Sequence, residues 1–250
     1  MTSQAKKSPI AIWKLITFLL LGLIIGYIVG RFELTTITFR TTSENENTKT
    51  EQTAKTNNTA DTAKTPEPEK PVTVNIEGDN FLGNKDAKIV LIDFSDYQCP
   101  VSKYFTTTML PKLKADYIDT GKMKYVFKDY PLNMHKFAVQ ASLTAQCAGA
   151  QGKYWEMHDM IFNSQEEWSK VETPDETFKG YAKTLALNTA KFDECYASQA
   201  TRDEIMQDKK DGSDIGISGT PSLIVNGYIT RGVPQNYENF KSYIDSKTGQ

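Results

Sequence analysis

The residues Cys99-Pro100-Val101-Ser102 carry the clearest chemical signal in the sequence. They follow an apolar run, residues 89–94, and begin a segment with helical spacing, so we predict a strand that leads into a helix near Cys99. Unpaired backbone N–H groups and the helix dipole stabilise an anion at a helix N-terminus, where a thiolate forms closer to neutral pH. Cys99 is therefore a candidate nucleophile.

Ser102 occupies the position at which a Cys-x-x-Cys redox pair has its second sulfur. Its hydroxyl, one turn from Cys99, could donate a hydrogen bond to the thiolate, but Ser in a first helical turn is also a common capping residue. The sequence favours neither role. The alternative that Cys99 is only a small buried hydrophobic residue fits poorly with the polar residues Ser95 to Gln98 before it.

The composition restricts the class of partner. The 250 residues include 29 Lys and Arg against 31 Asp and Glu, so we expect no strongly basic surface and no binding to nucleic acid. There are three cysteines, an odd number. In an oxidising compartment one thiol remains free after the other two pair.

Residues 1–39 predict a cytoplasmic N-terminus and a transmembrane anchor. Residues 15–30 are uncharged and rich in Leu, Ile and Gly, and residues 10–13 extend this run past Lys14, whose stem can snorkel. The lysines of this region precede or interrupt the run, so the positive-inside rule exports the chain that follows. The alternative is a cleaved signal peptide, which also exports the rest. We find no small-x-small cleavage site after Val29, which favours a retained anchor.

Residues 40–71 predict a disordered linker rich in Thr and Pro. This segment contains no Val, Ile, Leu, Met, Phe, Trp, Tyr or Cys. It cannot bury enough apolar surface to offset the entropy lost on ordering. A flexible chain of this length typically spans roughly 30 Å, so the linker would hold a domain near the membrane.

The remaining residues, 72–250, predict one folded domain. Val72, Val74 and Ile76 alternate with polar residues as in a short strand, and Lys88 to Ser95 is typical of a buried central strand. After Cys99, four apolar residues lie at spacings of four on one helical face: Phe105, Met109, Leu113 and Tyr117. Pro111 should kink or restart this helix. Met123 to Phe127 predicts the next strand, which should be parallel to the first through a right-handed crossover.

The C-terminal part of the domain begins with a long helical block, about residues 135–216, with helix starts near Thr173 and Asn188. Two short strands, Ser222 to Val225 and Tyr228 to Thr230, flank Asn226-Gly227, which favours a tight hairpin. A helix at 237–243 closes the chain. The order of strand, helix, strand, helical block, hairpin and helix predicts an α/β fold.

Four segments, in order, resemble the membrane-tethered DsbA-like thioredoxin-fold oxidoreductases of bacteria. They are Asp93 to Pro100, Lys128 to Leu132, Gln151 to Asp159 and Gly219 to Pro221, and the resemblance extends over Val72 to Lys247. It implies a thioredoxin fold in which residues 135–216 are an inserted helical block. It also implies a thiol-disulfide oxidoreductase.

The resemblance assigns roles to individual residues. Cys99 matches the nucleophile, and Pro221 matches a cis-proline that faces the sulfur and leaves the backbone of Thr220 free to pair with an extended substrate peptide. Without this context, Pro221 would be interpreted as an ordinary trans proline. Asp93 matches a buried proton acceptor, with an exposed carboxylate at a strand end as the alternative. The expected substrate-binding residues are Pro100, Val101, Thr220 and Pro221.

Cys147 and Cys195 both fall in the helical block. Some proteins of the resembled family carry an additional disulfide in this insertion, which implies that these two cysteines pair. We prefer a structural disulfide to a redox relay, because pairing them leaves Cys99 as the free thiol.

Ser102 departs from the family pattern and restricts the mechanism. Without a second sulfur at position 102, a mixed disulfide on Cys99 needs a thiol from elsewhere for its resolution. That thiol belongs to the substrate, giving isomerisation, or to a small thiol or redox partner. A third route first oxidises Cys99 to a sulfenic acid.

The sequence therefore predicts thiol-disulfide exchange on exported, cysteine-containing polypeptides through a single cysteine. The alternatives are a non-catalytic chaperone or peptide-binding module and, last, a one-cysteine peroxidase.

The two histidines, His135 and His158, allow a Cys-His catalytic pair in principle. We favour packing or capping roles for them, since both lie in helical segments of the family type. Their spacing does not match a zinc site, and we expect no metal and no cofactor.

Overall fold

The computed structural model of the chain describes residues 70–230 and 232–248. The expected anchor and all but the last two residues of the expected linker lie outside this range. No helix within the described ranges is long and apolar enough to cross a bilayer.

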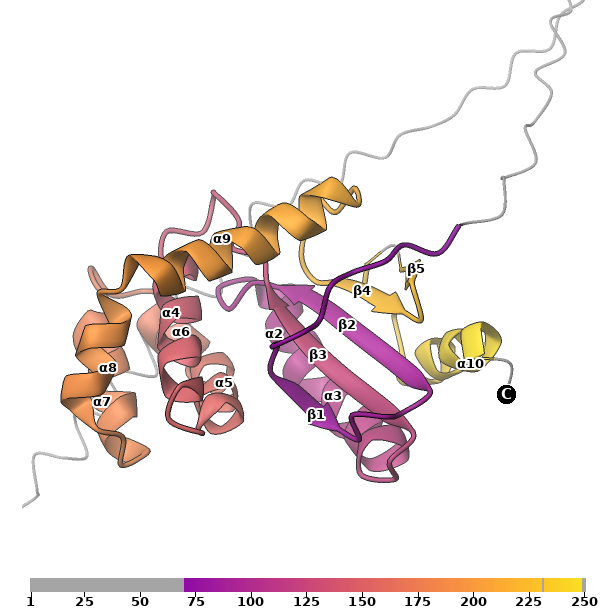
Figure 1. Cartoon of the computed structure of the whole chain (residues 1–250), viewed down its shortest axis with the longest axis horizontal. Helices are drawn as coiled ribbons and strands as arrows, with labels where there is room; N and C mark the ends of the chain where they lie inside the picture. The colour runs from indigo at the N-terminus through magenta and orange to yellow at the C-terminus, as the bar shows by residue number, and fades with distance from the viewer. Residues whose placement is uncertain (1–69, 231, 249–250) are drawn as a thin grey trace, which may run out of the picture. The chain divides into compact units, whose positions relative to one another are not determined.

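A five-stranded sheet in the order β1-β3-β2-β4-β5 forms the centre of the domain (Figure 1). Its strands are β1 (Phe81–Gly83), β2 (Ile89–Ser95), β3 (Met123–Asp129), β4 (Ser222–Val225) and β5 (Tyr228–Ile229). The pair β2 and β3 is parallel, and the other three pairs are antiparallel. The predicted central strand, the parallel crossover and the C-terminal hairpin are therefore confirmed. Asn226 and Gly227 have φ values of 46° and 87°, as a tight primed turn requires.

The crossover from β2 to β3 is one continuous helical segment. It comprises α2 (Pro100–Tyr104), π-helical turns η1 (Phe105–Met109), α3 (Leu110–Leu113) and η2 (Lys114–Ile118). Pro111 was expected to kink or restart the helix, and it lies in the first turn of α3, where the α-helix begins again directly after η1. The N–H of Leu110 reaches back to the carbonyl of Phe105, so the wider turn accommodates the proline while the segment continues. The four residues spaced by four are buried on one face, as predicted.

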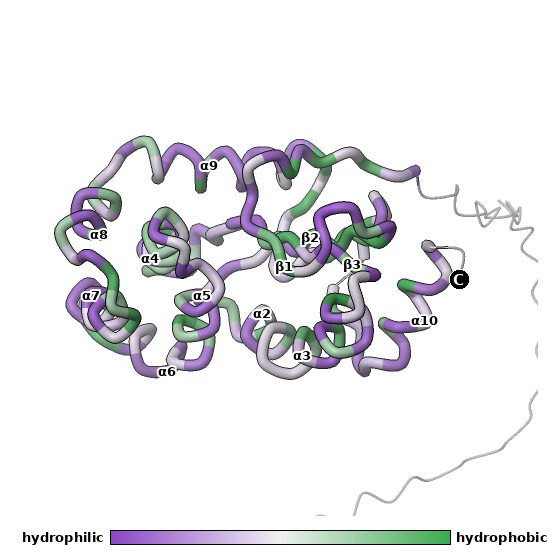
Figure 2. The backbone as a smooth tube through the Cα atoms, turned by 60° about the horizontal axis from the view of Figure 1, so that its bottom comes forward, coloured by the Kyte–Doolittle hydropathy of each residue, from purple (hydrophilic) through white to green (hydrophobic). Residues whose placement is uncertain are grey.

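The helical block and the C-terminal helix complete the domain. Their elements are α4 (Ala138–Gly149), α5 (Tyr154–Asn163), α6 (Gln165–Trp168), α7 (Asp175–Thr184), α8 (Thr189–Tyr196), α9 (Gln199–Asp214) and α10 (Tyr237–Thr248). Helices α4 to α8 gather beside the sheet, and α9 runs from them back across it (Figure 1). Figure 2 shows that α9 is largely hydrophilic while β2 and β3 carry apolar stretches. At Gly212 a Cβ would lie 2.9 Å from the ring of Phe94, so glycine permits the close approach of α9 to the sheet.

Side chains of β2 alternate between two apolar clusters. Leu91 belongs to the cluster that contains the crossover helix and the helical block, whereas Ile92 and Phe94 belong to a smaller cluster on the other face. Asp93 pairs in register between Phe127 and Leu223, and by the two-residue period of a strand it shares the face of Leu91. The buried acid therefore lies on the face that the crossover helix covers.

The expected strand at Val72 to Ile76 is wrong. Residues 70–76 form no strand, although their apolar side chains do pack against the smaller cluster and the N–H of Val72 donates to the carbonyl of Gly227 at 2.8 Å. The edge strand is β1 instead, which pairs with β3. The alternation of apolar and polar residues in this segment therefore reflects burial of one side of an extended chain, not pairing in a sheet.

Cys147 and Cys195 form a disulfide between α4 and α8, closing a loop with a sequence separation of 48 residues. We expect the double substitution Cys147→Ala, Cys195→Ala to lower the free energy of unfolding by about 3–4 kcal/mol, because the unfolded chain regains the freedom that the cross-link removes. Urea unfolding of the full chain measures this loss. The variant should keep the reactivity of Cys99. Loss of that reactivity without loss of stability would support a redox relay instead.

Candidate active site

Cys99 is the free cysteine of the chain and the N-cap residue of the crossover helix. Pro100 follows in the first turn, where its missing N–H costs nothing. Cys99 is 6% exposed, and its Sγ donates a hydrogen bond to the backbone carbonyl of Thr220 at 3.3 Å. The sulfur thus lies at the boundary between the helix start and a loop 121 residues away in the sequence.

The Thr220–Pro221 peptide bond is cis. The loop precedes β4, and the pairing of Ser222 with Phe94 and of Leu223 with Asp93 brings it beside the end of β2, from which the chain leads into Cys99. A pocket of about 430 Å³ lies along this loop and the β5 edge, lined in part by Ser218, Thr220, Pro221, Ile229 and Thr230. The hydroxyl of Thr220 is buried and has no hydrogen-bond partner within the described residues. The pairing of β2 with β4 therefore brings the expected nucleophile close to Thr220 and Pro221.

Asp93 is fully buried rather than exposed at a strand end. The hydroxyl of Tyr125 donates to its Oδ2 at 2.9 Å, while Oδ1 has no hydrogen-bond partner in the described part of the chain. Burial raises the pKa of Asp93 to about 7, and the bond from Tyr125 opposes this rise. A carboxyl group with this pKa can hold or release a proton near neutral pH.

Ser102 is fully buried, and its Oγ makes no hydrogen bond to any described residue. Of the two roles left open above, capping is wrong, because Cys99 is the N-cap and no side chain caps this helix. The bond to the sulfur is not formed either, since Ser102 Oγ has no hydrogen-bond partner among the described residues. By contrast, Val101 is 49% exposed and Pro100 is exposed, so both are accessible to a substrate.

Asp96 holds the turn before Cys99. Its buried carboxylate accepts hydrogen bonds from the backbone N–H groups of Gln98 and Leu132, each at 2.7 Å, and lies 2.8 Å from Nδ1 of His135. His135 therefore contacts the turn before the nucleophile. Sequence reasoning missed this role of Asp96, because its partners at Leu132 and His135 are distant along the chain.

His158 is fully buried in a cluster of aromatic rings that includes Tyr97, Phe127 and Phe162. Burial lowers its pKa, so the ring is neutral at physiological pH. This environment agrees with a packing role.

Two glutamine side chains join the turn before Cys99 to the helical block. Gln98 accepts a hydrogen bond from the N–H of Phe137 at 2.8 Å. Gln165, at the start of α6, donates through Nε2 to the carbonyls of Tyr97 at 2.7 Å and Cys99 at 3.1 Å. Sequence reasoning did not identify Gln165, because no motif links a single amide to two carbonyls more than 60 residues away.

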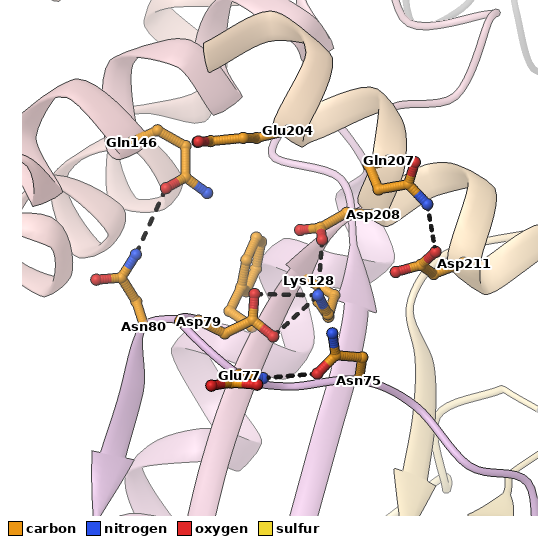
Figure 3. Close-up of a pocket in the computed structure, with 12 residues that line it drawn as sticks. Asn75, Glu77, Asp79, Asn80, Lys128, Gln146, Glu204, Gln207, Asp208 and Asp211 are labelled. Atoms are coloured by element: carbon orange, nitrogen blue, oxygen red, sulfur yellow. Dashed lines mark hydrogen bonds and ion pairs between the residues drawn. The ribbon is translucent and has the colours of Figure 1, made fainter. Parts of the chain in front are cut away.

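A second pocket, of about 320 Å³ and lined mainly by polar residues, lies between residues 75–80, which precede β1, and the elements β3 and α9 (Figure 3). Lys128 lies at its centre, with Nζ 3.0 Å from Oδ1 of Asp79 and 2.7 Å from Oδ1 of Asp208. Burial raises the pKa of Asp208 to about 7. Within the described ranges, no group of three or more His, Cys, Asp or Glu side chains is arranged to hold a metal ion. We interpret this cluster as an ion-pair network that joins three parts of the fold.

Comparison with known proteins places the chain in a family. The family model described as Thioredoxin matches residues 75–246. A Rickettsia bellii protein whose name assigns it to the protein-disulfide oxidoreductases is 30% identical over 155 residues, which cover 62% of this chain and 59% of that protein. Disulfide bond formation protein D of Bacillus subtilis is 27% identical over 183 residues, covering 69% of this chain and 78% of that protein.

The fold agrees with these matches. The crystal structure of Wolbachia pipientis alpha-DsbA1 superposes with a TM-score of 0.63 at 26% identity, covering 70% of this chain and 94% of that one. The chain spans less than two thirds of the length of the Rickettsia relative. The family match, the strand order and the helical block between β3 and β4 agree, and the chain therefore belongs to the thioredoxin family, with the DsbA-like form of its fold.

Proposed function

We propose that this chain is an enzyme that catalyses thiol-disulfide exchange on cysteine-containing polypeptides, with Cys99 as its single nucleophile. The observation that carries the proposal is the sulfur of Cys99 at a helix N-terminus, hydrogen-bonded to Thr220 beside cis-Pro221. The names of two relatives, a protein-disulfide oxidoreductase of Rickettsia bellii and a disulfide bond formation protein of Bacillus subtilis, support it.

The first step is an attack on a substrate disulfide. The Cys99 thiolate forms a bond to one sulfur of that disulfide, and the other substrate sulfur leaves as a thiolate, which takes up a proton. Deprotonation of Cys99 ends its donation to the carbonyl of Thr220. The substrate backbone is then free to pair along Thr220, next to the pocket that follows the β5 edge. In this step Asp93 serves as the buried acceptor of the proton that the Cys99 thiol releases.

The second step requires a thiol from another molecule, because a hydroxyl stands at position 102. If a thiol of the same substrate attacks the mixed disulfide, the net result is isomerisation. If a small thiol or a redox partner attacks the Cys99 sulfur, the substrate leaves with both of its thiols free and Cys99 stays in a disulfide with the attacking thiol, so the net result is reduction of the substrate. If peroxide first oxidises Cys99 to a sulfenic acid, a substrate thiol condenses with it and water leaves, which begins net oxidation.

Exposed apolar side chains near Cys99 fit an unfolded polypeptide as substrate. Val101 and Tyr104 on α2 are 49% and 44% exposed, and Met134, which precedes the His135 that contacts Asp96, is 82% exposed. Apolar side chains grouped on a surface are typical of a site that binds other chains. The segment 1–39 suggests that these substrates are exported ones, reached by a domain anchored on the outer face of the membrane.

Trapping tests the proposal directly. We expect the full chain, incubated with a peptide that contains a disulfide, to form a covalent adduct on Cys99 that reductant removes. Mass spectrometry at pH 6 to 8 detects it. Cys99→Ala should abolish the adduct, because the disulfide between Cys147 and Cys195 leaves no other thiol.

The same variant separates exchange from non-catalytic binding. A chaperone-like module would suppress aggregation of an unfolded protein equally well in the wild type and in Cys99→Ala. Absence of any adduct across this pH range, with binding retained, would reject the exchange mechanism. A sulfenic acid that forms and turns over rapidly with peroxide would favour a peroxidase.

A further inference from the structure

Gln165 comes from the helical block, yet it contacts the backbone on both sides of the nucleophile. The residue is 5% exposed, and both hydrogens of its amide nitrogen are directed at carbonyls of the catalytic turn, those of Tyr97 and Cys99. The Cys99 carbonyl also accepts the first helical bond, from the N–H of Lys103 at 3.0 Å. The Gln165 amide therefore links the carbonyl of Tyr97, which precedes the helix, to the carbonyl of Cys99, which accepts the first hydrogen bond of the helix.

This bridge determines where the sulfur lies. Cys99 has the extended conformation of an N-cap residue, with φ of −74° and ψ of 124°, and this conformation directs its side chain toward Thr220. A hydrogen bond to its carbonyl restrains ψ, and a bond to the Tyr97 carbonyl restrains the turn that precedes it. Without Gln165 these buried carbonyls would lose a donor, and the turn would relax toward other partners or water.

The bridge also matters for the charge of the sulfur. Backbone N–H groups at a helix N-terminus stabilise an anion that lies at the helix start. The amide restrains Cys99 as the N-cap residue of this helix, so it keeps the sulfur at the helix start without touching it.

The position of Gln165 is itself fixed. Trp168, on the same short helix, is buried and donates through Nε1 to the carbonyl of Ile161 at 2.8 Å. At the surface, Glu166 lies 3.7 Å from the ammonium of Lys103 on α2. These contacts hold α6 against α5 and α2, so the amide is held in place before substrate arrives.

We infer that Gln165 is a positioning residue for the exchange reaction, through which the helical block sets the orientation and the ionisation of Cys99. This inference rests on the proposed function, in which Cys99 is the nucleophile. It assigns to the inserted helices a direct part in the chemistry, beyond covering the sheet.

The test measures the alkylation of Cys99 by iodoacetamide against pH in the full chain. Gln165→Met keeps the length of the side chain and removes the donor. We expect the midpoint of its alkylation profile to rise by about 0.5–1 pH unit, and the rate at pH 7 to fall roughly three- to tenfold. Gln165→Glu places a carboxylate against the two carbonyls, so its midpoint should rise further.

Gln146→Met is the matched control. It makes the same change on α4, where the amide of Gln146 donates to Oδ2 of Asp129 at 2.8 Å and not to the catalytic turn, so it should lower the free energy of unfolding without moving the alkylation midpoint. A wild-type midpoint in both Gln165 variants would overturn the inference, as would an equal shift in Gln146→Met. Adduct formation with the disulfide peptide is scored separately in the wild type. Its failure would reject exchange as the function while leaving the effect of Gln165 on Cys99 measurable.

Discussion

Replacing Ser102 with Cys should shorten the lifetime of the mixed disulfide on Cys99 by at least about 100-fold, because an attacking thiol held in place has a very high effective concentration. Position 102 lies one helical turn from Cys99, is fully buried and has room for a hydroxyl that makes no hydrogen bond. A sulfur there would attack the Cys99 side of the adduct. The products would be a released substrate thiol and a disulfide between residues 99 and 102.

Adduct decay after removal of free peptide, followed by mass spectrometry, measures this effect. The peptide for this measurement has one cysteine, which forms a disulfide with a small thiol, so the leaving thiol is removed together with the free peptide. The wild-type adduct should then persist until a thiol is added, whereas the adduct of Ser102→Cys should decay without one. The variant would then act as a two-cysteine oxidant or reductant, according to its own redox state.

Thr106→Cys provides a matched control for this substitution. Like Ser102, Thr106 is buried on the same helical segment, and its hydroxyl has no hydrogen-bond partner within the described residues. It lies seven residues from Cys99, roughly 10 Å along a helix, which exceeds the reach of a disulfide. An adduct of Thr106→Cys should therefore last as long as that of the wild type. If the Ser102→Cys adduct is equally long-lived, position 102 is not the resolving position.

Local patterns predicted the frame of the fold well. The strand at 89–95, the helix starts near Thr173 and Asn188, and the Asn226-Gly227 hairpin each depend on neighbours in the sequence, and the structure has all of them. The edge strand β1 was missed, because three residues that end in Gly83 show no alternation. Pairing with β3, more than 40 residues away, is what makes it a strand.

The site was predictable only in part, and the reason is physical. Cys99 and Pro221 belong to short motifs, so the sequence could propose them as partners. Asp96 and Gln165 bind backbone N–H and carbonyl groups of distant residues. Because nearly all residue types carry the same backbone groups, the sequence does not show which of them a side chain will bind. Whether Asp93 is buried could not be decided from its strand alone, because the answer depends on the crossover helix that covers this face and on Tyr125 of the neighbouring strand β3, which donates to Asp93.

Asp93→Asn should stabilise the domain above pH 7, and this gain should disappear toward pH 4. The folded state holds the proton of Asp93 up to about pH 7, whereas an unfolded Asp releases it near pH 3.8. The folded state therefore binds more protons between these values, and the free energy of unfolding of the wild type falls as the pH rises through this range. Asn carries no charge at any pH, and its oxygen can accept the bond from Tyr125. We expect a gain on the order of 2–4 kcal/mol at pH 8.

Urea unfolding at pH 4, 6 and 8 checks this prediction. Burial also raises the pKa values of Asp129 and Asp208, so the free energy of unfolding should fall as the pH rises in both the wild type and Asp93→Asn. The difference between these two proteins isolates the contribution of Asp93. Asp86→Asn is the control, because the side chain of Asp86 is 76% exposed and its replacement should leave the profile unchanged. Parallel curves for the wild type and Asp93→Asn would mean that Asp93 ionises as freely in the folded domain as in the unfolded chain. A carboxyl that behaved in this way could not be the buried proton acceptor for Cys99.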